Sequence, residues 1–190
     1  MEKLLRAGFA ALGLPLDAAA LARFQTYYTL LDERSKVMNL TAIHGETDVA
    51  QLHFLDSAAL LTVEPLAGKS VIDVGTGAGF PGMPLLILRP DLQITFLDAL
   101  NKRILFLEDA LKRLGLTAAT LHARAEDAAK MAAHREQYDA AVSRAVANAA
   151  TLQELTLPFV KKGGISIAWK GPGVAEEMTA AKRAAFLLGG

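Results

Sequence analysis

The apolar residues of this chain follow two different periods, and the change between them divides the sequence. In the first part they recur every three or four residues, which is the spacing of one face of a helix. This spacing predicts a helix over residues 4–12, a second helix whose N-terminus Asp17 can cap, and a third over residues 46–61. We therefore expect residues 1–64 to form an N-terminal helical segment packed on the rest of the protein.

From residue 65 onward the apolar runs become short and continuous, which is typical of strands buried on both faces. These runs predict five strands, over residues 70–74, 93–97, 119–122, 140–143 and 165–169. Helical patterns lie between and after them, over residues 84–88, 102–114, 126–133, 149–160 and 174–188. The alternation predicts an α/β fold, a doubly wound domain with a mostly parallel sheet over residues 65–190. Because 190 residues is near the usual size of one domain, we expect one folding unit overall.

Composition narrows the class of protein. Hydrophobic residues make up 52% of the chain and charged residues 21%, a balance that fits a globular domain and excludes a disordered tail. Cysteine is absent, which excludes disulfides, thiolate metal sites and thiol nucleophiles. His44, His122 and His134 show no metal-ligand spacing, so no metal is expected.

No run of residues reads as a membrane span, and residues 1–6 do not resemble the start of an export signal. These features favour a cytoplasmic protein, and we expect a monomer. The formal net charge is zero, whereas nonspecific affinity for nucleic acid comes from an excess of lysine and arginine. Any RNA binding must therefore use a local basic patch near the crevice where substrates bind, for which the candidates are Lys102, Arg103, Lys161, Lys162 and Lys170.

The most informative segment is residues 71–82, Val-Ile-Asp-Val-Gly-Thr-Gly-Ala-Gly-Phe-Pro-Gly, in which a predicted buried strand runs into a glycine-rich turn and then a helix. Gly75, Gly77 and Gly79 allow the backbone to turn tightly and to approach a ligand closely. Unpaired N–H groups at the start of the helix favour an anionic group. In this way an α/β sheet presents a site for a nucleotide-like cofactor.

Two classes of cofactor fit such a turn. Gly77, Gly79 and Gly82 have the spacing Gly-x-Gly-x-x-Gly of dinucleotide-binding proteins. Asp73 favours S-adenosyl-L-methionine (AdoMet), because a carboxylate beside the turn would repel a pyrophosphate and would attract the ammonium group of AdoMet. The turn therefore indicates AdoMet, with an NAD(P)-dependent oxidoreductase on the same fold as the alternative.

Two acidic residues further along the chain are candidates for contacts with the ribose and adenine. Asp98 ends the second predicted strand, about 20 residues after the turn, where an acid accepts hydrogen bonds from both ribose hydroxyls. The alternative is that Asp98 caps the helix beginning near Asn101. Glu126 follows the third strand, in the loop that faces an adenine in this architecture, and it can equally be a first-turn acid of the next helix.

The fourth predicted strand ends at Ser143-Arg-Ala-Val146, at the edge where open α/β sheets bind substrates. Enzymes that methylate exocyclic base amines carry an Asn or Asp, two prolines and an aromatic residue there, and methylation at pyrimidine carbon 5 requires a cysteine. This chain has neither. Guanine N7 has a free lone pair and needs no general base, so alignment alone can suffice. Arg144 could position guanine O6 or the AdoMet carboxylate. The residues that follow it are apolar, so we expect a ligand or solvent to satisfy its donors; the alternative is a structural ion pair with a helix acid.

Several motifs together resemble one known family, the bacterial small-subunit (16S) rRNA guanine-N7 methyltransferases, also called the glucose-inhibited division protein B or RsmG family. The matching segments follow in family order across most of the chain: Met38-Asn-Leu-Thr41, His53-Phe-Leu-Asp-Ser57, Asp73 to Gly82, Leu97-Asp98 with Lys102-Arg103, Ser143-Arg-Ala145 and Lys170-Gly171. The resemblance implies a Rossmann-like class I AdoMet-dependent methyltransferase that modifies one guanosine in the decoding-region loop of 16S rRNA. Its partner would be small-subunit ribosomal RNA or the ribosomal subunit.

The resemblance also implies site residues. The implied AdoMet contacts are Gly75, Phe80, the backbone or side chain of Ala125 and Glu126, and Arg144, to which the arguments above add Gly77 and Asp98. The substrate candidates, which lie in family motifs together with Asp56 and Ser57, are Asn39, His53 and Lys170. For His53 the alternative is a hydrogen-bonded core or capping residue.

The family's sheet normally ends with two further strands in antiparallel arrangement, whereas this chain stops after the last predicted helix. We therefore expect those strands to be missing and one edge of the sheet to be exposed. From a different class of protein, the alternative function is a noncatalytic RNA-binding or assembly factor that retains a vestigial cofactor pocket.

Overall fold

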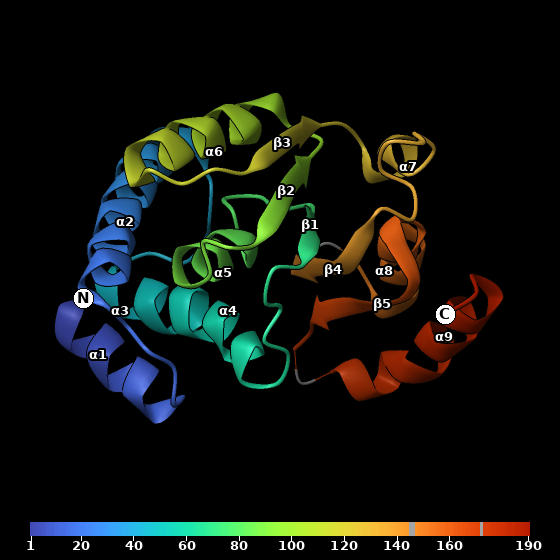
Figure 1. Ribbon diagram of the computed structural model, residues 1–190, viewed down its shortest axis with the longest axis horizontal. Coiled ribbons are helices and arrows are strands. Elements are labelled where there is room, and N and C mark those ends of the chain that lie inside the picture. The colour runs from blue at the N-terminus through green and yellow to red at the C-terminus, as the bar shows by residue number, and fades with distance from the viewer. Residues whose placement is uncertain (145–146, 172) are drawn as a thin grey trace.

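A five-stranded parallel sheet forms the centre of the molecule (Figure 1). The computed structural model describes residues 1–144, 147–171 and 173–190. The strands lie side by side in the order β3-β2-β1-β4-β5, and each neighbouring pair is parallel. Their bounds are Ser70–Val74 (β1), Gln93–Asp98 (β2), Ala119–His122 (β3), Tyr138–Arg144 (β4) and Val160–Trp169 (β5). The predicted doubly wound α/β fold is confirmed, because β1 lies in the middle and the chain proceeds outward from it in both directions.

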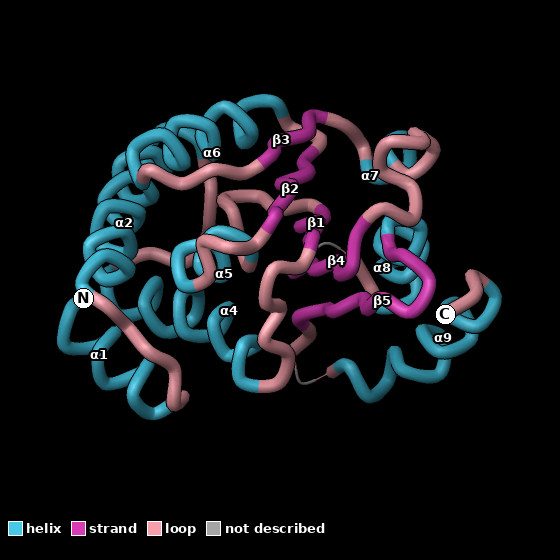
Figure 2. The backbone as a smooth tube through the Cα atoms, in the orientation of Figure 1, coloured by secondary structure: helices cyan, strands magenta, loops and turns pink. Residues whose placement is uncertain are grey.

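Helices alternate with the strands and cover both faces of the sheet (Figure 2). They are α5 (Gly82–Leu88), α6 (Asn101–Leu114), α7 (Ala125–Ala128), α8 (Ala149–Thr156) with the 3-10 turn η3 (Leu157–Phe159), and α9 (Val174–Leu187). The prediction of a helix over residues 126–133 is wrong in its second half. Residues 130–133 are exposed, so they lack the apolar face that would hold a longer helix on the sheet.

The N-terminal segment is helical, as expected. Its elements are α1 (Glu2–Ala11), α2 (Ala18–Met38), and one continuous run made of α3 (Glu46–Asp48), η1 (Val49–Leu55), α4 (Asp56–Ala58) and η2 (Ala59–Thr62). Asp17 caps α2, since its Oδ1 accepts a hydrogen bond of 2.7 Å from the N–H of Ala20. The helix predicted over residues 46–61 is irregular, because η1 is a π-helical stretch. Such stretches are rare and often lie at functional sites.

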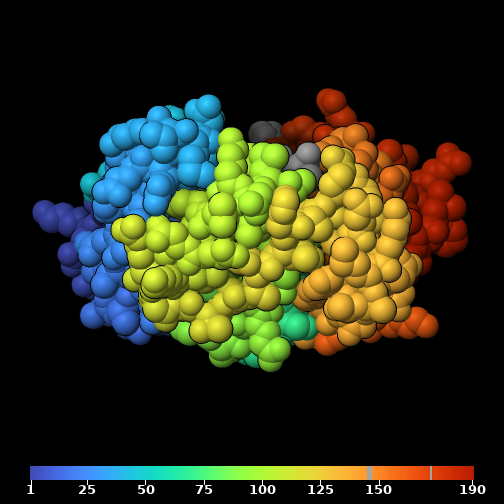
Figure 3. Space-filling model, turned by 90° about the horizontal axis from the view of Figure 1, so that it is seen from above, coloured from blue at the N-terminus to red at the C-terminus, as the bar shows by residue number. Residues whose placement is uncertain are grey.

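The hydrophobic core continues from the sheet into the N-terminal helices. Phe24 lies between two other rings, with its centroid 5.5 Å from that of Phe9 and 4.9 Å from that of Phe54. Side chains of α1, α2, η1, α5 and α6 share this core with residues of β1, β2 and β4, while a smaller core lies under α7 and α8. Figure 3 shows the atoms of α2 and α6 side by side, where Arg34 pairs with Asp109 at 3.5 Å.

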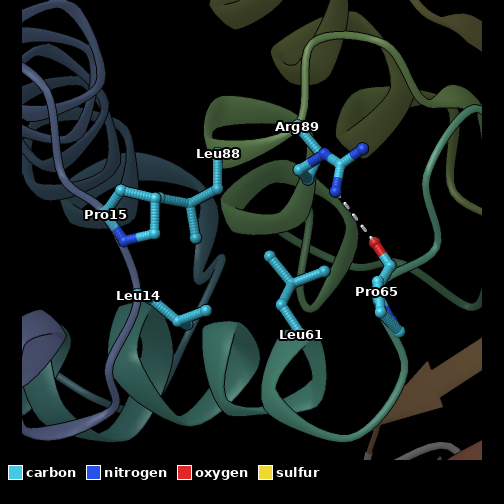
Figure 4. A pocket seen from close by; sticks show the side chains of 6 residues that line it. All are labelled: Leu14, Pro15, Leu61, Pro65, Leu88 and Arg89. Carbon is cyan, nitrogen blue, oxygen red and sulfur yellow. Dashed lines mark hydrogen bonds between the residues drawn. The ribbon is translucent and has the colours of Figure 1, made fainter.

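A small apolar pocket lies at the amino edge of the sheet, where the strands begin (Figure 4). Its volume is about 120 Å³, and it is lined by Leu14, Pro15, Leu61, Pro65, Leu88 and Arg89. Arg89 is its one charged residue, and that side chain already pairs with Asp91 at 2.7 Å. Substrates of open α/β sheets bind at the opposite edge, which is where the glycine-rich turn between β1 and α5 lies.

Candidate functional site

The glycine-rich turn joins β1 to α5 at the carboxyl edge of the sheet. Gly75, Gly77 and Gly79 all have positive φ, of 68°, 61° and 94°, which side-chain-bearing residues rarely adopt. The N–H groups of Gly75 and Thr76 both donate to the carbonyl of Leu97, at 2.9 and 3.0 Å, and so fix the turn against the end of β2. The predicted roles of the glycines in shaping the backbone agree with this conformation.

Asp73 stabilises the turn through hydrogen bonds to two of its residues. Its carboxylate is fully buried, and Oδ2 accepts hydrogen bonds from the Thr76 hydroxyl at 2.7 Å and from the Gly82 N–H at 2.9 Å. Burial raises the pKa of Asp73 to about 6, against the opposing effect of these two donors. Asp73 therefore has a structural role within the turn. Its buried Oδ1 accepts no hydrogen bond from the described residues, and its contact with an ammonium group stays a prediction.

A cavity of about 280 Å³ opens beside the turn. Residues at the ends of β1, β2 and β3 and at the start of α7, with one residue of α8, form its wall: Val74, Gly75, Leu97, Asp98, Ala99, Ala123, Arg124, Ala125, Glu126 and Leu155. This set includes four of the residues that the sequence predicts to contact AdoMet. The cavity therefore lies where the sequence places the ribose and adenine.

Asp98 is the acid at the centre of this wall. It is only 3% exposed, and its Oδ2 accepts hydrogen bonds from the Gly77 N–H at 2.9 Å and from Arg103 Nη1 at 3.2 Å. Its Oδ1 accepts one from the N–H of Leu100, the residue just before α6, at 2.9 Å. The two alternatives for Asp98 are therefore compatible, because one carboxylate lines the cavity and also supports the start of the helix.

Ala125 and Glu126 begin α7 and line the same cavity. The carboxylate of Glu126 pairs with Arg124 at 3.2 Å, and both side chains are largely exposed. A backbone hydrogen bond is the largest cause that lowers the pKa of Glu126, and the bond from Arg124 lowers it further. Glu126 is thus a first-turn acid, and its backbone is the part of the residue that is fixed at the cavity wall.

Arg144 ends β4 and is held by the N-terminal segment. Its Nη1 donates to the carbonyl of Leu52 at 3.0 Å and to Asp56 Oδ2 at 3.1 Å, and its Nη2 donates to His53 Nδ1 at 2.5 Å. The guanidinium carbon lies 4.9 Å from the ring centroid of Phe80, in the glycine-rich turn. Arg144 therefore connects the turn to η1 and α4.

The expectation that a ligand or solvent satisfies Arg144, drawn from the apolar residues that follow it, is wrong for the three donors described above. The polar partners come from about 90 residues earlier in the chain, so no pattern near Arg144 shows them. The structural ion pair considered as the alternative is present, with Asp56 as the acid. Ala145 and Val146, which complete the motif, lie outside the described residues.

His53 is a buried support for Arg144. It is 6% exposed, and its ring stacks on Phe80 with centroids 4.1 Å apart and planes 7° apart. Its Nε2 lies 2.8 Å from Thr41 Oγ1. Burial, reinforced by the charge of Arg144, lowers the pKa of His53 to about 3, so the ring is neutral. Nδ1 then accepts from Arg144 while the Nε2 proton is donated to Thr41. This geometry favours the core alternative for His53 over direct substrate contact.

The other two substrate candidates make no hydrogen bond to Arg144 or His53 among the described contacts. Asn39 ends α2 in the left-handed conformation, with φ 49° and ψ 53°, which is a common role for asparagine. Lys170 Nζ donates to the carbonyl of Ala147 at 3.0 Å and pairs with Glu177 at 2.8 Å. Lys170 therefore ties the segments after β4 and β5 to α9.

The prediction that Lys161 and Lys162 lie near the substrate crevice is wrong. The strand β5 begins at Val160, earlier than predicted, so both lysines lie at the amino edge of the sheet. Lys161 pairs there with Asp139 at 2.9 Å. Lys102 and Arg103 begin α6 at the carboxyl edge and are the basic candidates that remain close to the cavity.

Sequence reasoning missed Tyr27 of α2, which supports the glycine-rich turn. Its hydroxyl donates to the carbonyl of Ala78, and its burial raises its pKa. In the sequence Tyr27 is one apolar residue of a helical face, so no signal distinguishes it.

Over the described ranges no group of three potential metal ligands occurs, and none of the helices there is long and apolar enough to cross a membrane.

The neutral state of His53 has a consequence for stability that can be measured. A histidine with a lowered folded-state pKa contributes stability that is present above its unfolded-state pKa, near 6.5, and lost as the pH falls toward 3. We expect His53→Gln to destabilise the protein by about 2 kcal/mol more at pH 7 than at pH 5, when unfolding in denaturant is compared with wild type. Asp73 has the opposite pH dependence, but it is common to both proteins and cancels.

His122→Gln serves as the control for loss of an imidazole, since His122 lies at the exposed end of β3. An equal destabilisation by His53→Gln at both pH values would show that His53 is protonated in the folded protein near pH 5, and would contradict the arrangement described above.

The sheet order, the glycine-rich turn and the acid at the end of β2 together define a class I AdoMet-dependent methyltransferase fold. A solved structure assigned as a caffeoyl-CoA O-methyltransferase of Staphylococcus aureus matches with a TM-score of 0.55 and 13% identity, over 85% of this chain and 81% of the other. One assigned as an S-adenosyl-L-methionine-dependent methyltransferase of Methanococcus maripaludis matches with a TM-score of 0.54 and 17% identity, over 80% and 68%. At such identities the likeness establishes the fold.

The family follows from closer relatives. A family model described as GidB, rRNA small subunit methyltransferase G, matches residues 20–190. Ribosomal RNA small subunit methyltransferase G of Clostridium botulinum is 51% identical over 170 residues, which are 88% of this chain and 71% of the relative. That of Pelotomaculum thermopropionicum is 45% identical over 192 residues, covering 100% of this chain and 80% of the relative. The chain belongs to this family, and the resemblance drawn from its motifs is confirmed.

Proposed function

We propose that this protein transfers the methyl group of AdoMet to N7 of a guanosine in small-subunit (16S) ribosomal RNA. The observation that carries the proposal is the contact between the glycine-rich turn, beside the cofactor cavity, and the end of β4, where substrates bind. Phe80, in the glycine-rich turn beside the cavity, lies under the guanidinium of Arg144, which ends the strand where substrates bind. A methyl donor held by the turn and a base held by Arg144 would therefore be neighbours.

The residues at the cavity fit AdoMet. Asp98 presents two oxygens, and Oδ1 accepts only one hydrogen bond from the described residues, so it keeps a position for a ribose hydroxyl. We assign the remaining contacts to the backbone at Gly75, Ala125 and Glu126, which line the cavity, and to Gly77 and Phe80 of the adjoining turn. When bound, AdoMet supplies an electrophilic methyl group on a sulfonium centre.

Arg144 and the side chains around it, His53, Asp56 and Phe80, form a cluster that we call the Arg144 cluster. It fits a nucleophile that does not have to lose a proton before it attacks the methyl group. His53, the one imidazole in the cluster, is buried, neutral and hydrogen-bonded through both ring nitrogens, so it is not placed to act as a general base. Guanine N7 carries a lone pair at neutral pH, and positioning alone can supply about 7 to 11 kcal/mol of the barrier. Three of the five guanidinium N–H groups of Arg144 are used by described residues, which leaves two for guanine O6 or the AdoMet carboxylate.

Asp98→Ala is expected to weaken AdoMet binding by about 1 to 3 kcal/mol, because a nearly buried carboxylate that bonds the ribose would be lost. Calorimetric titration measures this directly. Asp91→Ala is the matched control, since Asp91 also accepts from a backbone N–H and pairs with an arginine, but at the amino edge. An unchanged dissociation constant for folded Asp98→Ala would leave Asp98 as a support for α6 only.

The NAD(P)-dependent oxidoreductase alternative is separated by a simple binding test. AdoMet or its demethylated product should raise the melting temperature in a concentration-dependent way, and NAD should not. Stabilisation by NAD alone would reverse the proposal. A noncatalytic RNA-binding factor would bind RNA without transferring labelled methyl groups.

We further propose that residues 1–64 and 65–190 form one folding unit, that the protein is a monomer, and that it acts in the cytoplasm. The shared core between the N-terminal helices and the sheet supports the first point. Action on ribosomal RNA supports the last.

A further inference from the structure

We propose that Trp169 is the aromatic surface on which the target guanine stacks while Arg144 holds its edge. This inference rests on the proposed function and goes beyond it by naming the contact with the face of the base. Trp169 ends β5 and is the only tryptophan in the chain.

The sheet places Trp169 directly beside Arg144. The two residues are partners in the parallel register of β4 and β5, so their side chains project from the same face of the sheet. Both side chains contact Asp56 of α4. Trp169 Nε1 donates to the backbone carbonyl of Asp56 at 3.2 Å, and Arg144 Nη1 donates to its carboxylate at 3.1 Å. One residue thus fixes the indole and the guanidinium relative to each other.

Trp169 differs from the other rings of this cluster in its exposure. Phe80 and His53 are 5% and 6% exposed and stack on each other, so their faces are already covered. Trp169 packs partly on the larger core, but it is not among the fully buried residues and keeps part of its surface accessible. A ring with its only polar atom already bonded and part of its surface exposed is suited to apolar contact with a ligand.

The chemistry of the base matches this pair of side chains. Sequence-specific proteins commonly bind single-stranded RNA loops by stacking a splayed base on an aromatic ring while its edge is hydrogen-bonded. Guanine offers a π-face to the indole and the O6 acceptor to a guanidinium. Methylation at N7 places a positive charge on the base, which an indole face also attracts.

Kinetics with the RNA substrate that the wild-type protein methylates tests the inference. Trp169→Leu should raise the KM for RNA about tenfold, the usual effect of losing one stacking contact. Its AdoMet dissociation constant should stay unchanged, and Trp169→Phe should restore most of the RNA affinity because it keeps a flat ring. Phe186→Leu is the matched control, since it removes an exposed ring near the C-terminal end of α9.

Fluorescence provides a readout that a purely structural role would not change. Because Trp169 is the sole tryptophan, its emission should be quenched by the substrate RNA hairpin and not by a hairpin with an abasic site in place of the target guanosine. An unchanged KM in Trp169→Leu, or equal quenching by both hairpins, overturns the inference while methyl transfer by the wild type stands. If Trp169→Leu and Trp169→Phe lose AdoMet binding and thermal stability to the same extent, the role of Trp169 is core packing, and the inference is wrong. Absence of methyl transfer by the wild type removes the proposed function itself, and this inference with it.

Discussion

Arg144→Lys is expected to lower single-turnover methyl transfer about a hundredfold, because misplacement of a positioned group by about 1 Å can have an effect of that size. Lysine keeps the positive charge and can still reach Asp56, but it lacks the planar set of donors that now bonds Leu52, His53 and Asp56 together. The guanidinium would no longer be held over Phe80, and the donors assigned to the base or the AdoMet carboxylate would be lost.

The same variant should lower the free energy of unfolding by about 1 to 3 kcal/mol, because the buried His53 Nδ1 and the carbonyl of Leu52 would lose their donor. The measurement is a rapid-quench single turnover alongside the thermal midpoint. Arg89→Lys is the matched control, since Arg89 also pairs with an aspartate and donates to a carbonyl, but at the amino edge. Near-wild-type turnover by Arg144→Lys would leave the residue as a structural ion pair outside the site.

Gly79→Ala should have the largest effect on the glycine-rich turn. A Cβ at this position would lie 2.6 Å from the Tyr27 hydroxyl and 2.8 Å from Leu107 Cδ2, and the backbone has φ +94°. Tyr27 is fully buried and bonded to Ala78, so it cannot move aside without breaking the turn. We expect a loss of about 2 to 4 kcal/mol in the free energy of unfolding and loss of AdoMet binding.

Gly115→Ala separates the steric clash from the backbone strain. Gly115 ends α6 with φ +62°, and no atom lies within 4 Å of a Cβ built there. Its replacement should reduce stability by about 1 to 2 kcal/mol, the strain of a left-handed residue alone, and leave AdoMet binding intact. Equal losses from the two variants in denaturant unfolding would mean that Tyr27 does not hold the turn.

The features that depend on local sequence could be predicted. The strands β1 and β3 have the predicted bounds. For β1 the reason is a short apolar run that lies between Gly68 and Gly75. The glycine-rich turn and Asp98 could be placed for the same reason, since one segment of about 30 residues contains the strand, the turn and the acid.

The features that depend on distant contacts could not be predicted. The partners of Arg144 lie on a π-helical stretch of the N-terminal segment, and a helical pattern does not show which neighbour it will face. The sequence does not predict the position of Lys161 and Lys162, because the exposed start of β5 lacks the continuous apolar run of a buried strand. Trp169 carries no signal of its own in the sequence, and its role follows only from its register with Arg144.

The most direct test of the proposed function is transfer of a labelled methyl group from AdoMet to small-subunit ribosomal RNA, followed by location of the modified atom. The assay should compare naked 16S rRNA, an assembly intermediate and the complete small subunit as substrates. The proposed function predicts incorporation of one methyl group per RNA into at least one of these substrates, at a single guanosine whose strand becomes cleavable by the reduction and aniline treatment specific for 7-methylguanosine. Methyl incorporation at another atom, or none with any of the three substrates despite AdoMet binding, would contradict it.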